Sequence, residues 1–198
     1  QEKFLSKALT STERVISIVN DLLKIDLVDE NNEIYNFKST DLSKLAEEVS
    51  FEFTNQLETK QIKLNINKPK ALLPDIELEP NKIRMVLENI LDNAIKYTPK
   101  GGTVELKISD ERLNSAEPTV VVSVTDSGIG IPLEETDKIF QKFFRAGNAI
   151  KAEPDGSGLG LFLARDMVEK HGGSIWFKTD PGRGTTFSFS LPLHQKKV

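Results

Sequence analysis

The chain has 198 residues, 38% of them hydrophobic and 28% charged, which is enough for one or two folded domains with a substantial core. It contains no cysteine and two histidines, which excludes disulfides, thiolate metal sites and a cysteine nucleophile, and disfavours a multi-histidine metal centre. A net charge of −4 argues against a dedicated nucleic-acid binder, which would carry a basic excess. The sequence has no membrane-length apolar run and no N-terminal signal pattern, so we expect a cytosolic protein or a piece of a larger one.

The first 28 residues have the apolar pattern of one long helix. Leu9, Ile16 and Leu23 are seven apart, and further apolar residues beside them widen the stripe. This width favours a helix in a bundle or a dimer; the alternative is a terminal helix packed on its own domain. The polar run 29–33 is a plausible boundary, so we predict a partial helical domain over 1–30 and a second domain over 34–194.

The rest of the chain mixes helical and strand patterns. Caps, breakers and periodicity predict, in chain order, a strand at Ile34–Phe37, a helix from Asp41 to about Leu57, strands at Ile62–Ile66 and Ile76–Leu78, a helix over Pro80–Tyr97, strands at Val104–Ile108 and Val120–Val124, a helix from about Gly160 to Lys170, and strands at Ser174–Thr179 and Thr185–Leu191. The long Gly- and Pro-containing segment from Asp126 to Gly160 is expected to be functional. We therefore predict an α+β fold, a two-layer sandwich of a mixed, mainly antiparallel sheet and a helical layer, preceded by the long helix.

The helix predicted at Pro80–Tyr97 carries polar residues beside its apolar stripe. Asn89, Asn93 and Lys96 fall at positions i, i+4 and i+7, one above the other. Amide oxygens are suitable Mg²⁺ ligands and lysine binds phosphate, so this face is a candidate site. The alternative is an ordinary solvated face.

Two glycine motifs flank the long loop. Asp126-Ser127-Gly128-Ile129-Gly130 follows an apolar strand, where a carboxylate can accept a hydrogen bond from an exocyclic amine and glycines admit a flat ring; a capped tight turn is the alternative. Gly156-Ser157-Gly158-Leu159-Gly160 opens a helix and can form an anion nest, or else a flexible hinge. Neither matches the dinucleotide fingerprint or the P-loop.

A phenylalanine-rich patch lies between the two glycine motifs. It consists of Phe140, Phe143, Phe144 and Arg145, and its simplest role is to anchor the long loop to the core.

The order of these motifs resembles the catalytic domain of two-component sensor histidine kinases. The asparagine helix, Asp-x-Gly-x-Gly, the phenylalanine-rich lid, Gly-x-Gly-x-Gly and a final Gly-Thr-Thr-Phe correspond to that family's N, G1, F and G2 boxes, over about Asp41 to Pro192. The resemblance implies the Bergerat ATP-binding fold, with ATP or ADP and Mg²⁺ as ligands. It also implies a protein kinase that transfers the γ-phosphoryl group of ATP to histidine.

On the helix and the lid, the resemblance implies specific roles. Asn93 would ligate Mg²⁺, with Asn89 lining the phosphate side. Lys96 would contact phosphate, Tyr97 would lie beside the nucleotide, and Arg145 would reach the γ-phosphate. Asn89, Asn93, Lys96 and Arg145 are thus the expected catalytic residues.

The two glycine motifs receive roles in the same way. Asp126 would bind the adenine amine, often with a water that Thr186 could help hold, while Gly128 and Gly130 shape the adenine wall. The second motif would wrap the phosphates, through Gly156, Gly158, Leu159 and Gly160.

The resemblance also has a gap. The family's acceptor histidine lies on the first helix of a dimerisation hairpin, and residues 1–30 resemble only the second helix. Neither His171, at a helix C-terminus where it suits capping and the dipole, nor His194 in the tail has the acceptor context. We expect a fragment that cannot autophosphorylate and that belongs to a homodimer.

The expected partner of the whole protein is the receiver domain of a response regulator, with no nucleic acid. We expect a cytoplasmic domain, with membrane anchoring only through segments upstream. Two other functions stay open: a serine kinase or ATPase of the same fold, disfavoured by Asn89 where those families tend to have glutamate, and a non-catalytic nucleotide-binding dimerisation module.

Overall fold

A computed structural model describes Thr12 and residues 35–70, 73–110 and 118–194. The predicted helix over 1–28 and the domain over 1–30 lie outside the described residues, apart from Thr12. No helix in the described part of the chain is both long enough and apolar enough to cross a membrane.

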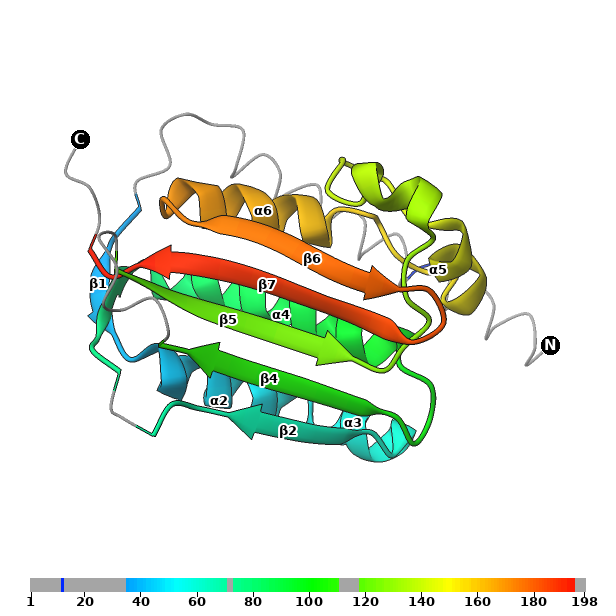
Figure 1. The fold of residues 1–198 in the computed structure, drawn as a ribbon, viewed down its shortest axis with the longest axis horizontal. Coiled ribbons are helices and arrows are strands. Elements are labelled where there is room, and N and C mark those ends of the chain that lie inside the picture. Colours follow the sequence, from blue (N-terminus) through cyan, green and yellow to red (C-terminus); the bar gives the residue numbers. More distant parts are fainter. Residues whose placement is uncertain (1–11, 13–34, 71–72, 111–117, 195–198) are drawn as a thin grey trace.

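The domain has two layers, with the helices on one face of a sheet (Figure 1). The sheet has the strand order β2-β4-β5-β7-β6, where β2 is Lys63–Asn67, β4 is Thr103–Ser109, β5 is Thr119–Asp126, β7 is Gly184–Pro192 and β6 is Ser174–Asp180. Only β2 and β4 pair in parallel; the other neighbours are antiparallel. A separate antiparallel pair joins β1 (Lys38–Thr40) to β3 (Ile76–Leu78). The predicted mixed, mainly antiparallel sandwich is confirmed.

The helical layer consists of α2 (Leu42–Glu52), α3 (Thr54–Lys60), α4 (Pro80–Tyr97) and α6 (Gly160–Lys170). The long loop carries a 3₁₀ turn, η1 (Leu133–Lys138), and the short helix α5 (Gly147–Ala152). Alternating strand residues face the helices: β4 buries Val104, Leu106 and Ile108. These side chains meet the apolar stripe of α4, including Ile83, Val86 and Leu87, in one core.

Local signals explain most element boundaries. Pro80 occupies the first turn of α4, and the Glu79 carboxylate accepts the Lys82 N–H at 2.7 Å, which caps the helix. Asp41 caps α2 as predicted, by accepting the Lys44 N–H at 3.0 Å. The predicted bounds of α4 are confirmed.

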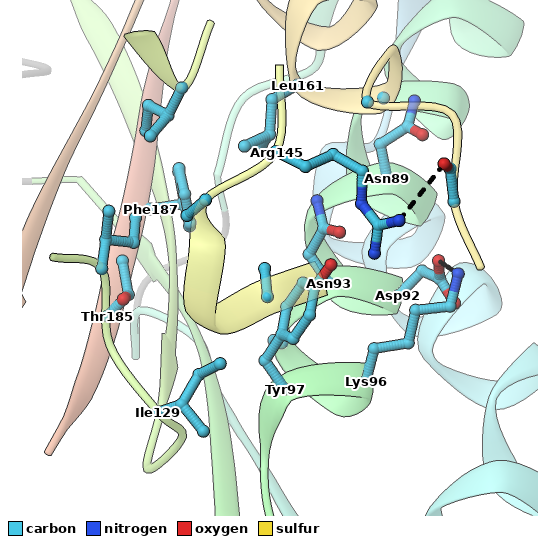
Figure 2. Close-up of a pocket in the computed structure, with 18 of the residues that line it drawn as sticks. Asn89, Asp92, Asn93, Lys96, Tyr97, Ile129, Arg145, Leu161, Thr185 and Phe187 are labelled. Carbon is cyan, nitrogen blue, oxygen red and sulfur yellow. Dashed lines mark hydrogen bonds and ion pairs between the residues drawn. The ribbon is translucent and has the colours of Figure 1, made fainter. Parts of the chain in front are cut away.

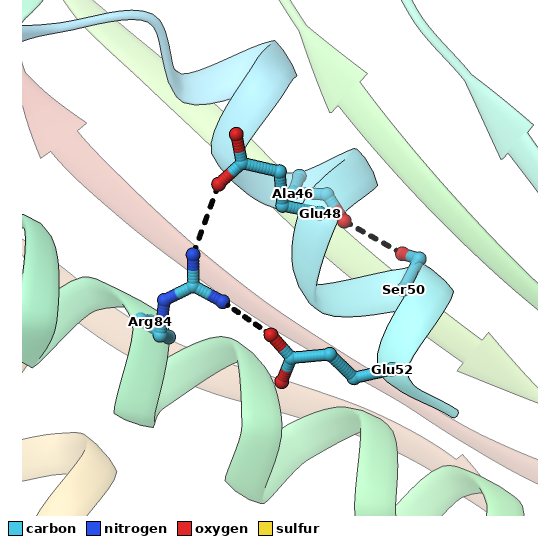
Figure 3. Close-up of polar contacts among 5 residues, drawn as sticks. All are labelled: Ala46, Glu48, Ser50, Glu52 and Arg84. Atoms are coloured by element: carbon cyan, nitrogen blue, oxygen red, sulfur yellow. Dashed lines mark hydrogen bonds and ion pairs between the residues drawn. The ribbon is translucent and has the colours of Figure 1, made fainter. Parts of the chain in front are cut away.

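The helix predicted from Asp41 to Leu57 is wrong in its length, because it breaks at Phe53 into α2 and α3. The Ser50 hydroxyl donates to Ala46 O at 2.7 Å (Figure 3). The Thr54 hydroxyl donates to Phe51 O at 2.6 Å. Such side-chain bonds compete with the helical ladder and bend it. The predicted strand at Ile34–Phe37 is also misplaced, since β1 begins at Lys38.

An ionic clamp joins α2 to α4 (Figure 3). Arg84 of α4 donates to Glu48 at 2.9 Å and to Glu52 at 2.7 Å, one turn apart on α2. All three side chains are partly exposed, so the clamp contributes modestly to stability and mainly orients the two helices.

Candidate nucleotide-binding site

A cavity of about 300 Å³ opens at one end of the sandwich. It lies between the C-terminal half of α4, the end of β5, the starts of β7 and α6, and residues 131–159, which we call the lid segment. In Figure 2 Ile129, Thr185 and Phe187 lie at one end, and Asn89, Lys96 and the guanidinium of Arg145 at the other. The volume is in the range of small-molecule sites.

The polar face of α4 lines this cavity. Asn89, Asn93 and Lys96 all border it, together with Asp92 and Tyr97. The Asn89 amide nitrogen donates to Met85 O at 2.9 Å, so its oxygen is the atom directed away from the helix ladder. Among the described residues, Asn93 has no hydrogen-bond partner for its side chain, which leaves its amide for a ligand.

Lys96 is held by the preceding turn. Its ammonium lies 2.7 Å from the Asp92 carboxylate, an i,i+4 ion pair. Burial alone would lower the pKa of Lys96, but the hydrogen bond and charge of Asp92 more than offset it and raise the pKa. Lys96 therefore presents a positive charge to the cavity at neutral pH.

Asp126 supplies a buried carboxylate at the opposite end. The inward alternation of β5, Val120, Val122 and Val124, ends on Asp126, which is only 8% exposed. Its Oδ1 accepts the N–H groups of Gly128 at 2.8 Å and Thr185 at 3.3 Å. Burial raises the pKa of Asp126 to about 6, although these two bonds act in the opposite direction. Both bonds end on Oδ1, so Oδ2 is left for a ligand.

Two glycines of the glycine motifs lie close to residues that border the cavity. A Cβ at Gly128 would lie 2.6 Å from both Asp126 Oδ1 and Tyr97 O, and one at Gly160 would lie 2.7 Å from Asn89 Oδ1. The first keeps the loop close to the carboxylate, and the second keeps the start of α6 close to the asparagine face. A side chain at Gly128 would collide with the backbone of Tyr97, whereas one at Gly160 would displace the amide of Asn89.

Two kinds of contact hold the lid segment. Ile139 and Leu159 are buried in the core and Phe140 and Phe144 pack against it, as expected for the phenylalanine-rich patch, whereas residues 147–158 include no buried residue and are held by polar contacts. Arg145 donates to the carbonyls of Glu153, Pro154 and Gly156, the last two at 2.8 and 3.4 Å. The Gly147 N–H donates to Glu135 Oε2 at 2.9 Å. The guanidinium of Arg145 thus organises the segment that leads into the second glycine motif.

The structure brings most of the predicted site residues together. Ten of them line the cavity: Asn89, Asn93, Lys96, Tyr97, Asp126, Gly130, Arg145, Gly156, Gly158 and Gly160. Gly128 donates its N–H to Asp126, and Leu159 is buried in the core; neither residue lines the cavity.

Thr186 is not at the cavity. Its hydroxyl lies 3.0 Å from that of Thr125 on the outer face of the sheet, whereas its neighbour Thr185 lines the cavity and contacts Asp126. Strand alternation is the reason, because Thr185 is in phase with the inward Phe187 and Phe189. We therefore replace Thr186 by Thr185 in the candidate site.

Sequence reasoning also missed two polar residues. Asp92 was detectable, since it stands four residues before Lys96 on the same helix. Asn148 was not: its amide nitrogen donates to Gly130 O at 2.8 Å and joins the lid segment to the first glycine motif, a contact that depends on the path of the loop.

His171 does not line the cavity. It is fully buried, its Nε2 accepts the Glu79 N–H at 3.0 Å, and its Nδ1 lies 2.6 Å from Met167 O. Burial lowers the pKa of His171, so the neutral ring is favoured. The expected capping of α6 is confirmed, but a charged interaction with the helix dipole is not its basis.

Comparison with known families decides the class. Residues 78–195, more than half of the chain, match the family described as histidine kinase-, DNA gyrase B- and HSP90-like ATPases. The chain belongs to this family. The solved catalytic domain of the histidine kinase ThkA is 31% identical, with a TM-score of 0.68, and the match covers 80% of this chain and 97% of that one. The described residues therefore form an ATP-binding catalytic domain of the histidine kinase type.

Longer relatives are sensor kinases. The sensor histidine kinase WalK of Bacillus subtilis (strain 168) is 36% identical over 98% of this chain, which spans 31% of that protein. A crystal structure of ThkA with the response regulator protein TrrA matches with a TM-score of 0.74 and 26% identity, over 96% of this chain and 51% of that one. The chain thus spans about a third of the curated relative.

Proposed function

We propose that this chain binds ATP with Mg²⁺ in the cavity and transfers the γ-phosphoryl group to a histidine of a helical hairpin. The phosphoryl group then passes to an aspartate of a response-regulator receiver domain. One observation carries this proposal: the asparagine–lysine face of α4, the buried carboxylate of Asp126 and the second glycine motif open onto one cavity.

The Asp126 end suits adenine. Oδ2 of the carboxylate accepts a hydrogen bond from the exocyclic amine, while Ile129, Ile131 and Phe187 provide an apolar lining for the ring. Guanine carries a carbonyl where adenine carries its amine, and two acceptors would face each other. The site therefore favours ATP over GTP.

The α4 end suits the triphosphate. Lys96 and Arg145 supply positive charge, and the backbone N–H groups of the second glycine motif supply donors. The donor set fits Mg²⁺, a hard cation that prefers oxygen ligands: Asn93 would hold it, with Asn89 beside it. When bound, the ion neutralises phosphate charge during transfer.

Asn89 favours transfer over hydrolysis. Its neutral amide is bonded to Met85 O and cannot take a proton from an attacking water. An ATPase of the same fold is disfavoured on this ground, and we expect slow steady-state ATP turnover by the chain alone.

The acceptor histidine is not His171, because that side chain is fully buried and both ring nitrogens are engaged. We propose that residues 1–30 belong to the second hairpin helix, that the hairpin pairs two copies in the whole protein, and that any membrane anchor lies upstream. The ThkA–TrrA complex supports a response regulator as partner.

Binding and transfer assays test this function. Calorimetry should show MgATP binding that GTP does not match, and Asn93→Ala should weaken it by roughly tenfold or more. Asn55→Ala, on the exposed surface of α3, should bind like the wild type. In a second assay, labelled ATP and a histidine-bearing hairpin from a WalK-type relative should yield acid-labile, alkali-stable phosphate on the hairpin. Equal ATP affinity in the Asn93 variant would overturn the site, and acid-stable label would overturn the histidine acceptor.

A further inference from the structure

The last turn of α4 has an unusual set of partners. Helix C-termini leave about four carbonyls without intrahelical donors. Here Ala94 O accepts both the N–H and the hydroxyl of Thr98, at 3.2 and 2.6 Å, and Tyr97 O accepts the Ile129 N–H at 3.3 Å. The end of the helix is thus bonded to the loop that lines the adenine side.

Lys60, the last residue of α3, donates hydrogen bonds to the remaining carbonyls at the end of α4. Its ammonium donates to Ile95 O at 2.8 Å, Lys96 O at 2.7 Å and Thr98 O at 3.3 Å. An ammonium has three N–H donors, and all three are used. In return, the Gly101 N–H donates to Lys60 O at 2.9 Å, so the tether is anchored at both ends.

The same turn presents side chains to the cavity. Lys96 and Tyr97 both line it, with Asn93 one turn earlier. The carbonyl end of a helix carries partial negative charge, which would oppose a triphosphate bound nearby. The Lys60 ammonium is hydrogen-bonded to these carbonyls, and its positive charge offsets their partial negative charge.

We propose that Lys60 is a positioning residue for nucleotide binding, one that holds the last turn of α4 so that Lys96 and Tyr97 face the ligand. This inference rests on the proposed ATP site. Lys60 does not line the cavity, so it acts through the helix end rather than by touching the nucleotide.

The test compares Lys60→Met with Lys63→Met, in this chain as it stands. Methionine keeps the apolar stem and removes the ammonium. Lys63 is an exposed residue at the start of β2, three positions away, so its variant makes the same charge change without touching α4. With folding verified by circular dichroism, Lys60→Met should weaken MgATP binding between about ten- and a hundredfold, and Lys63→Met should not.

A double-mutant cycle separates positioning from simple stabilisation. If Lys60 acts through Lys96, Lys60→Met should lose most of its effect on MgATP affinity in a Lys96→Met background. Additive effects would overturn the proposal. Lys60→Arg, which keeps charge and donors, should restore most of the affinity, and it serves if the methionine variant fails to fold. Failure of the wild type to bind ATP defeats the proposed function; wild-type affinity in Lys60→Met defeats this inference alone.

Discussion

The two walls of the cavity are built by different forces. The wall formed by α4 and β5 belongs to the core: Ile83, Val86 and Val124 are at most 1% exposed. The carbonyls of the last turn of α4 all accept hydrogen bonds. The lid segment buries no residue of η1 or α5 and carries exposed Leu133, Phe143 and Ile150. Ile139 and Leu159 anchor the lid segment in the core, but residues 147–158 between them include no buried residue and depend on a few polar tethers.

This difference has a consequence for binding. Segments with few buried apolar contacts open at low free-energy cost, whereas core elements open only near global unfolding. The α4–β5 wall is therefore preformed, and residues 147–158 are the part of the lid segment that opens most easily. Under the proposed function, the first would receive adenine and the metal and the second would rearrange around the phosphates. Variants on the two walls should differ accordingly.

The largest effect is expected on the preformed wall, from Asp126→Asn. The asparagine Oδ1 still accepts the Gly128 and Thr185 N–H groups, so its NH₂ group faces the adenine amine donor to donor. We expect a loss of roughly ten- to hundredfold or more in MgATP affinity, measured by calorimetry. Asp137→Asn, on exposed η1, is the matched control. Unchanged affinity in Asp126→Asn would show that the carboxylate is not the adenine contact.

The same variant should stabilise the ligand-free fold. Because burial raises the folded pKa of Asp126 from 3.8 to about 6, its ionisation at pH 7 costs the fold about 3 kcal/mol. This cost appears as pH rises through the folded pKa and is absent below the unfolded value. Denaturant unfolding should therefore show a gain of up to about 3 kcal/mol at pH 7 that vanishes near pH 4. A gain in the free energy of unfolding that does not change with pH would show that the ionisation of Asp126 is not its cause.

Arg145→Met tests the lid segment. Losing three carbonyl partners should increase amide hydrogen exchange in residues 153–158, with little change in the global free energy of unfolding. We expect MgATP affinity to fall about tenfold and adenosine affinity to stay the same. Arg183→Met, whose side chain is 82% exposed, provides the control. Equal losses for ATP and adenosine would mean that the lid segment also shapes the adenine end.

The smallest effect is expected from Gln61→Gly, behind the preformed wall. Gln61 ends α3 in the left-handed region, with φ of 53°, where glycine carries no Cβ penalty. We expect about 0.5–1 kcal/mol of added stability by thermal or denaturant unfolding, with unchanged nucleotide affinity. Gln61→Ala should give no gain. A change in affinity would show that the α3–β2 turn, which also carries Lys60, couples to the site.

The sequence anticipated features that depend on near neighbours along the chain. The bounds of α4, its apolar stripe and the alternation of β4 all follow from local periodicity and caps. It failed where local hydrogen bonds compete, as at Phe53, and where strand phase was not applied, as at Thr186. The inward series Phe187, Phe189 and Leu191 contained the signal for Thr185.

The sequence by itself determined the fold class, the helix that carries Asn89, Asn93 and Lys96, and the motifs that form the cavity. Only the tertiary structure decided that Asn148 reaches Gly130 O, that Arg145 holds the loop carbonyls, and that Lys60 completes a helix 35 to 38 residues away. The physical reason is the separation along the chain over which each kind of interaction acts. Periodicity and caps act within a few residues, whereas these polar contacts exist only after core packing has brought distant segments together.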